Sequence, residues 1–283
     1  MIASEFEVHE LLPPWPQSFA ERLSAILEKQ ILSVNGLTSG RYSTSNFLKE
    51  PLEIPVIERL DRTLTERVEF LSPGVCAQFE RVGLRFPGVA EVALLKVDDL
   101  FQRVRTLLEG NNSLRASVES FVKAIHIIRS NGPDYDCSFS DPEIPFSIFI
   151  SIPGLTEKNR ELRALEAIMH ECMHLQLTAF ELQTPTVRKE GGAARSYSPW
   201  KKSMRKVQGI LHGMYVFHVI AYAYSILIES GSLVPSEVTF GQRRIRGILA
   251  ELDEVRGIEF SSDLTPAGRG LVQALLAQSA MKL

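Results

Sequence analysis

The chain has 283 residues, of which 45% are hydrophobic, and its formal net charge is -3. This length can bury one large core or two small ones, and because the apolar content is even and marks no break, we expect a single domain over residues 1–283. A slightly acidic chain lacks the basic face that nucleic acid or an anionic membrane requires, and we therefore expect small molecules or peptides as partners.

The compartment is predicted from the first residues and from the cysteines. Residues 1–7 are acidic and include no apolar run of the kind that a secretory signal needs. Cys76, Cys137 and Cys172 are an odd number and are widely spaced, so they predict neither a disulfide framework nor a zinc knuckle. A cytoplasmic protein fits these features best.

The part up to about residue 115 is expected to be helical. Ser18 has the character of a helix cap, and apolar residues follow it at helical spacing. Residues 97–108 show the same spacing before Gly110 and two asparagines end the pattern.

A metal-site core is expected over about residues 116–230, beginning with two strands at 121–128 and 146–152. Residues 131–134 have the composition of a turn between them. His126 falls in the first strand, where a lone histidine is usually a packed or surface-exposed side chain. Pro142, Pro145 and Pro153 flank or interrupt the second strand, which predicts a sheet edge where an extended peptide could add as a strand.

The most specific motif is His170-Glu171-Cys172-Met173-His174, within a run of good helix formers. Two histidines four residues apart lie on one face of a helix and can bind one metal ion. Glu171 points about 100° away from His170, where it can reach a water on the metal. Cys172 is expected to be a small buried packing residue.

After the motif helix, residues 183–198 are polar and predict a loop, and a long apolar helix is expected from near Ser203. Residues 209–228 carry no formal charge, so this helix has the length of a membrane span, but its histidines and tyrosines favour a buried core helix. A C-terminal helical cover over about 231–283 is expected to hold an amphipathic helix at 240–258 and a last helix at 265–280.

A third metal ligand is sought among the remaining acids and histidines. Glu181 lies seven residues beyond His174, roughly 10 Å along the helix axis and too far for the same ion. His212 and His218 point about 240° apart on one helix, so only one can face the motif. Glycines flank His212 and would let that face approach another helix closely, so we choose His212, and the reverse assignment stays open.

From residue 124 to 228 the chain resembles the HExxH-domain proteins found with ribosomally made, post-translationally modified peptides. The positions that carry the resemblance are Asp134-Tyr135-Asp136, Ser140-Asp141-Pro142, Pro145-Phe146-Ser147-Ile148-Phe149, His170-Glu171 with His174, Ser198-Pro199-Trp200 and Leu211-His212-Gly213. The resemblance implies Fe(II)- and 2-oxoglutarate-dependent hydroxylation of a side chain of a precursor peptide at its β-carbon, with iron held by His170, His174 and His212.

The implied cosubstrate has a distal carboxylate that needs a cation. Arg205 precedes His212 by seven residues and lies on the same face if the helix begins that early, so it is the candidate. Lys201 is the alternative in the same basic stretch.

Three functions are compatible with these residues. The first is the peptide hydroxylase, with Fe(II), 2-oxoglutarate and oxygen. The second is a zinc metallopeptidase in which Glu171 is the general base. The third is a metal-stabilised peptide-binding module. In each case the predicted fold is α+β and mainly α-helical, with a zincin-like helix that carries H-E-x-x-H beside a small β-sheet.

Overall fold

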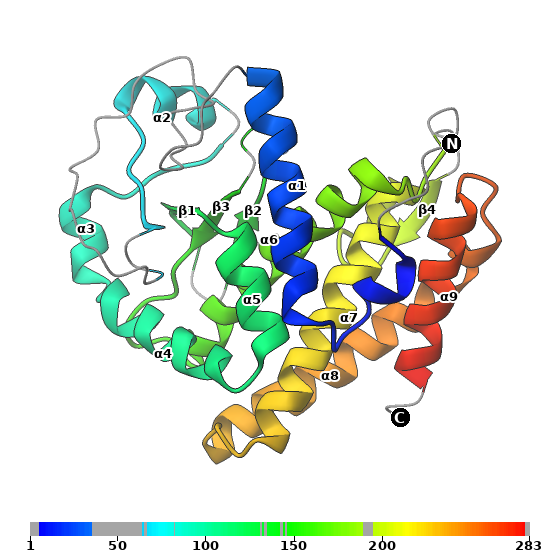
Figure 1. Cartoon of the computed structure of the whole chain (residues 1–283). Coiled ribbons are helices and arrows are strands. Elements are labelled where there is room, and N and C mark those ends of the chain that lie inside the picture. The colour runs from blue at the N-terminus through cyan, green and yellow to red at the C-terminus, as the bar shows by residue number, and fades with distance from the viewer. Residues whose placement is uncertain are drawn as a thin grey trace. The chain divides into compact units, whose positions relative to one another are not determined.

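The computed structural model describes residues 6–35, 64, 67–81, 83–130, 132, 135–141, 144, 146–188 and 195–280 (Figure 1). Within these residues the protein is mainly α-helical and has two small sheets, which confirms the predicted α+β class. The residues group into two compact units: the first unit comprises Met1–Phe19 and Gln176–Leu283, and the second unit comprises Ala20–Leu175. Helices α1 (Gln17–Asn35) and α6 (Arg160–Gln183) each contribute residues to both units.

The second unit begins with α1 and then has short helices before its sheet. These are α2 (Pro73–Glu80), α3 (Val89–Leu94), α4 (Val97–Glu109) and α5 (Asn112–Phe121). The helix predicted at 97–108 is confirmed as α4. The strand predicted from residue 121 begins three residues late, because the Asn111 side chain accepts from the Leu114 amide and starts a helix that buries Leu114, Val118 and Phe121.

The sheet of the second unit consists of β1 (Ala124–Ile128), β2 (Ser138–Phe139) and β3 (Ser147–Ser151), in the order β1-β3-β2. β1 and β3 are parallel, and β2 pairs antiparallel with β3. Both predicted strands are therefore present, but the prediction that the second one forms a sheet edge is wrong. Pro153 lies outside β3, so the β3 amides remain free to pair on both sides; Pro142 and Pro145, like residues 131, 133 and 134 of the predicted turn, lie outside the described residues.

The two faces of this sheet have different neighbours. Phe149 and Phe139 are cross-strand partners with ring centroids 4.3 Å apart, and Phe79 of α2 packs on Phe149 at 5.2 Å. Because side chains alternate along a strand, Ser138 points to the opposite face, where it contacts α6. His126 is fully buried with its ring 4.6 Å from that of Phe149, as a packed histidine should be.

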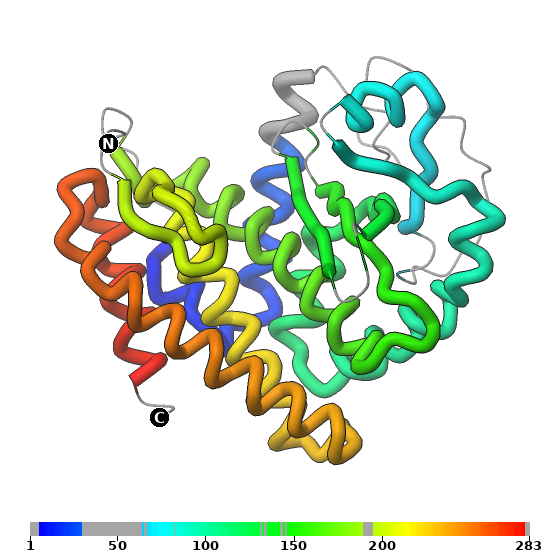
Figure 2. Tube along the Cα trace, turned by 180° about the vertical axis from the view of Figure 1, so that it is seen from behind, coloured from blue at the N-terminus to red at the C-terminus, as the bar shows by residue number. Residues whose placement is uncertain are grey.

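The first unit contains a short hairpin and three long helices. The hairpin strands are β4 (Arg195–Ser198) and β5 (Ser203–Lys206), and the helices are α7 (Val207–Glu229), α8 (Pro235–Glu254) and α9 (Pro266–Ala280), with 3-10 turns η1 (Val8–Leu11) and η4 (Arg256–Phe260). α7 contacts α8, α9 and both hairpin strands, and the hairpin is also visible from behind (Figure 2).

Three boundaries in this unit differ from the sequence prediction. Residues 195–198 form β4 rather than the end of a loop, and α7 begins at Val207 because residues 203–206 are extended and pair with β4. The amphipathic helix at 240–258 is α8, which begins earlier and ends at Glu254. The last helix is confirmed as α9.

α7 passes the length and composition test for a membrane span, and 78% of its most apolar 18-residue stretch is buried inside the structure. Burial to that degree is also what a core helix of a globular protein shows.

Candidate functional site

The motif residues lie in the middle of α6, as the run of helix formers predicts. The rings of His170 and His174 are side by side, with centroids 4.9 Å apart and planes at 69°. The His170 side chain is 22% exposed, and His174 is also partly exposed. Two imidazoles one helical turn apart and open to solvent are a suitable pair of ligands for one metal ion.

Glu171 lies beside this pair but is almost completely buried, with 2% of its side chain exposed. Its Oε1 accepts a hydrogen bond from the Ser138 hydroxyl at 2.7 Å and is 3.8 Å from His170 Nε2. A buried carboxylate needs such a partner, because an unpaired one costs several kcal/mol. Glu171 is therefore held between its own helix and strand β2.

The adjacent Cys172 has no exposed surface, and burial raises the pKa of its thiol well above the usual range. It stays protonated and packs as a small apolar side chain, as predicted.

Arg163, two helical turns before the motif, fixes the chain segment that leads into β2. Its guanidinium donates two 2.7 Å hydrogen bonds to the Asp136 carboxylate and a third, also 2.7 Å, to Glu157. The Arg163 side chain is only 10% exposed. These bonds raise the pKa of Arg163 further above its usual range, so the cation is permanent.

Arg160 anchors the start of the same helix. Its side chain is buried and donates to the Pro153 carbonyl at 2.9 Å and to the Leu95 carbonyl. Together with Arg163 and Glu171, it fixes α6 to its neighbours within the second unit, which positions the two histidines.

The third predicted ligand, His212, belongs to the first unit and lies on α7. Its Nε2 is 2.9 Å from Oε2 of Glu181, near the end of α6 in the same unit, and both side chains are 13% exposed. Glu181 also accepts from Thr186 and, at 3.2 Å, from Gln208. Burial alone would raise the pKa of Glu181, but the bond from His212 and the other donors outweigh it and lower this pKa.

His218, the alternative third ligand, is occupied by α9. It is 3% exposed, its Nδ1 is 3.1 Å from Ser279 Oγ, and its Nε2 is 2.9 Å from Gln278 Oε1. Both ring nitrogens thus have partners within the first unit.

Glycines flank His212, but, contrary to the sequence prediction, the side chains that lie against them do not come from another helix. A Cβ on Gly213 would lie 2.5 Å from the Trp200 ring, which stacks on Phe217 with centroids 5.2 Å apart. A Cβ on Gly209 would lie 3.6 Å from Arg205 Nε. The hairpin and its turn, not a helix, fill this space, because residues 203–206 form β5.

Because α7 begins only at Val207, Arg205 is not on the same helix as His212. It precedes α7 and is exposed on β5, so it does not continue the His212 face of a helix. Lys201 is exposed in the hairpin turn. Their predicted contact with a cosubstrate therefore rests on charge alone and no longer on helical spacing.

Among the residues that the structure describes, no group of three or more His, Cys, Asp or Glu side chains is arranged to hold a metal ion. The two motif imidazoles fit such a role as a pair, whereas a complete three-ligand set is not assembled there.

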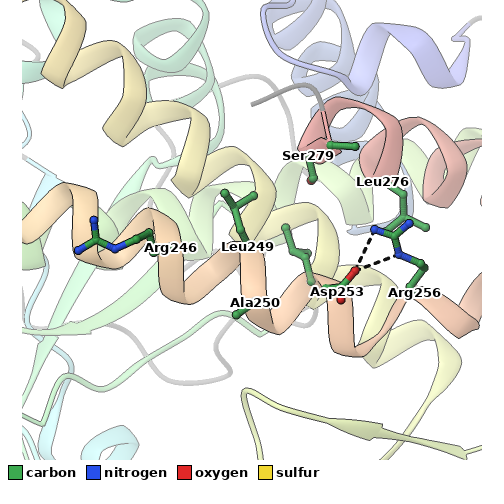
Figure 3. A pocket seen from close by; sticks show the side chains of 9 residues that line it. Arg246, Leu249, Ala250, Asp253, Arg256, Leu276 and Ser279 are labelled. Carbon is green, nitrogen blue, oxygen red and sulfur yellow. Dashed lines mark hydrogen bonds and ion pairs between the residues drawn. The ribbon is translucent and has the colours of Figure 1, made fainter. Parts of the chain in front are cut away.

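A pocket of about 370 Å³ lies between α8 and α9 of the first unit (Figure 3). Its lining includes Arg246 and Leu276, and Arg256 pairs there with Asp253 at 2.9 Å. It contains no predicted site residue, and neither histidine nor cysteine lines it, so it is not part of the candidate metal site.

No family model matches the chain, and no curated protein matches it closely enough to count as a relative. Of the positions that carry the resemblance stated above, Asp134, Pro142 and Pro145 lie outside the described residues.

Two residues of this site, Ser138 and Glu181, make contacts that the sequence does not predict. Ser138 lies in a two-residue strand, which is too short to show any alternation. Helical spacing excludes Glu181 as a ligand of an ion bound to His174 but does not indicate that it contacts His212. An acid among the apolar residues that end α6 is the one feature of the sequence that indicates a buried polar partner for Glu181.

Proposed function

We propose that this chain is a metal-dependent peptide hydroxylase that uses Fe(II) and 2-oxoglutarate to hydroxylate a side chain of a ribosomally made precursor peptide at the β-carbon. The observation that carries the proposal is the motif geometry: two partly exposed imidazoles side by side on α6, next to a carboxylate that is buried and hydrogen-bonded. The class of substrate comes from the resemblance over residues 124–228.

His170, His174 and His212 would hold the metal. The choice of His212 over His218 is supported by the first unit, since both nitrogens of His218 are engaged by α9. Glu181 supports it as well, because a carboxylate bonded to one nitrogen of a ligating histidine is the usual way to fix its ring and tautomer.

Glu171 is better suited to positioning than to proton abstraction. The oxygen nearer His170 is the one that accepts the Ser138 hydroxyl, so it is already engaged in a contact that joins the helix to β2. A metallopeptidase would need this carboxylate to take a proton from water. The same geometry supports a role in fixing His170 and the helix to β2.

A peptide could be bound at the open side of β2. This strand pairs with β3 alone among the described residues, so its other edge has unpaired backbone groups beside the motif helix. An extended peptide that added there would lie next to Ser138 and hence near Glu171. The contact between the motif helix and this antiparallel edge strand supports the proposed zincin-like arrangement.

Bound iron would supply the oxygen chemistry. Of the four electrons that reduce O2, two would come from the oxidative decarboxylation of 2-oxoglutarate to succinate and CO2, and two from the peptide C–H bond that becomes C–OH. Arg205 and Lys201 are the cations proposed to pair with the distal carboxylate of the cosubstrate. The protein's own contribution is to bind and orient these groups and to hold the peptide in extended form.

The test is anaerobic titration of the purified chain with Fe(II) and then with 2-oxoglutarate. A visible charge-transfer band, and succinate formation on admission of oxygen, are expected from the wild type and from Glu171→Gln. His170→Ala and His174→Ala should show neither, while Lys158→Ala, on the surface of the second unit, should behave as wild type. Absence of the band, together with shortened products when the zinc-loaded chain meets peptides, would instead establish the metallopeptidase.

A further inference from the structure

The hairpin β4–β5 concentrates positive charge in a chain that is slightly acidic as a whole. Residues 195–206 include five Lys or Arg and no Asp or Glu, against a net charge of -3 for all 283 residues. The basic residues are Arg195, Lys201, Lys202, Arg205 and Lys206, and all five are exposed. Among the described residues, none of these five side chains has a carboxylate partner, whereas Arg244 and Arg256 of the same unit each have one.

The strand register divides this charge between two faces. Arg195 pairs with Lys206 and Tyr197 with Met204, so these four side chains project from the same face of the hairpin. Arg205 pairs with Ser196 and belongs to the other face, where it lies against Gly209 of α7. We call the face with Arg195, Tyr197, Met204 and Lys206 the outward face. It does not include Arg205, the first cation proposed for the cosubstrate.

The outward face also exposes apolar surface. Tyr197 and Met204 are 51% and 52% exposed, directly opposite each other and next to the Arg195–Lys206 pair. Single exposed apolar residues need no explanation, but an aromatic and a methionine placed together between cations form a small amphipathic surface.

The backbone of the hairpin is equally open. In the described part of the chain, β4 and β5 pair only with each other, so each has one edge whose amides and carbonyls face no strand. An extended peptide can satisfy such an edge by adding as a third strand, which neither a nucleic acid nor a lipid headgroup can do. Charge and backbone therefore favour the same kind of partner.

We propose that the outward face of the β4–β5 hairpin binds an acidic segment of a peptide in extended conformation. On that face, one peptide side chain would be a carboxylate that pairs with Arg195 and Lys206, and the side chain two positions along would be apolar and contact Tyr197 and Met204. The identity of the peptide rests on the proposed function: if that is correct, the acidic segment belongs to the precursor peptide and does not include the residue that is modified.

The test uses the metal-free full chain and a short fluorescent peptide, measured by anisotropy, in which every second residue is Thr and the residues between are alternately Glu and Val. Wild type should bind it, and raising the salt from about 50 to 300 mM should weaken binding because exposed charges are screened. Arg195→Glu with Lys206→Glu should weaken binding by roughly tenfold or more, and Arg195→Gln with Lys206→Gln by less. The control pair Arg243→Glu with Arg246→Glu changes the net charge equally on exposed positions of α8 and should have little effect.

Backbone pairing has its own control: the same peptide with alternate amides N-methylated should bind more weakly. The proposal is overturned if the hairpin and α8 variants lose equal affinity, or if N-methylation has no effect. It is also overturned if a peptide with Lys in place of each Glu binds as tightly as the acidic peptide. It is also overturned if single-stranded DNA or phosphatidylserine vesicles bind the hairpin more tightly than the peptide. Since no metal is present, failure here leaves the hydroxylase test unaffected.

Discussion

Replacement of Ser138 by alanine removes the hydroxyl that donates to Glu171 at 2.7 Å. Hydrogen bonds to charged groups contribute about 1.5 to 3 kcal/mol. Glu171 is 2% exposed, but Ser138 is partly exposed, so water can enter where the hydroxyl was. The loss of unfolding free energy should then lie near the lower limit, about 1.5 kcal/mol.

A double-mutant cycle separates this bond from other effects of the substitution. In a Glu171→Met background the charge is absent, so Ser138→Ala should cost close to nothing. Urea unfolding followed by far-ultraviolet circular dichroism measures all four proteins. Ser140→Ala is the matched control, because Ser140 lies in the same segment and is also partly exposed, and its cost should stay within about 0.5 kcal/mol.

Equal costs of Ser138→Ala in the two backgrounds would show that the hydroxyl does not stabilise Glu171. The positioning role assigned to this carboxylate would then lose its support. A coupling of about 1 kcal/mol or more would confirm it.

Five further substitutions have distinct expected results. Arg163→Met should lower the unfolding free energy by about 1.5 to 3 kcal/mol through its lost charged bonds, and should speed amide exchange at residues 137–139. Burial lowers the pKa of His126 to about 4, so between about pH 6.5 and 4 the unfolded chain binds a proton that the folded chain does not bind. As the pH falls through this range, the unfolding free energy should decrease by about 1.4 kcal/mol per pH unit. His126→Phe should abolish this dependence in urea titrations at several pH values. His212→Ala should weaken metal affinity in a calorimetric titration, whereas His218→Ala should lower the melting temperature and leave metal affinity unchanged; the reverse ranking would reassign the third ligand. Arg205→Ala should raise the 2-oxoglutarate concentration for half-maximal turnover roughly tenfold, and an unchanged value would exclude this arginine.

The sequence predicts elements well where one physical signal dominates. α6 follows from a long run of helix formers, and β1 and β3 follow from short β-branched stretches. The hairpin was missed because its strands are polar and mostly exposed, so no apolar alternation marks them. β2 was missed because two residues carry no period at all.

In the candidate site, too, the sequence predicts the local contact but not the contacts between residues that are far apart in the chain. The pairing of His170 with His174 is local and follows from helical spacing alone. The bond between Ser138 and Glu171 joins residues 33 apart in sequence, and that between Glu181 and His212 joins residues 31 apart. Such contacts depend on how elements pack, which no spacing rule specifies.

The first unit is built from two stretches of chain, with the whole of the second unit between them. The earlier stretch is held by residues far downstream: Thr184 donates to the Phe6 carbonyl, and Gln278 of α9 reaches the Pro13 carbonyl at 3.4 Å. On a translating ribosome, the second unit can complete its contacts as soon as Leu175 has emerged, whereas residues 6–19 must wait for α9. We therefore expect these residues to be cut by protease in nascent chains that are stalled before residue 266, and to be protected once the finished chain is released.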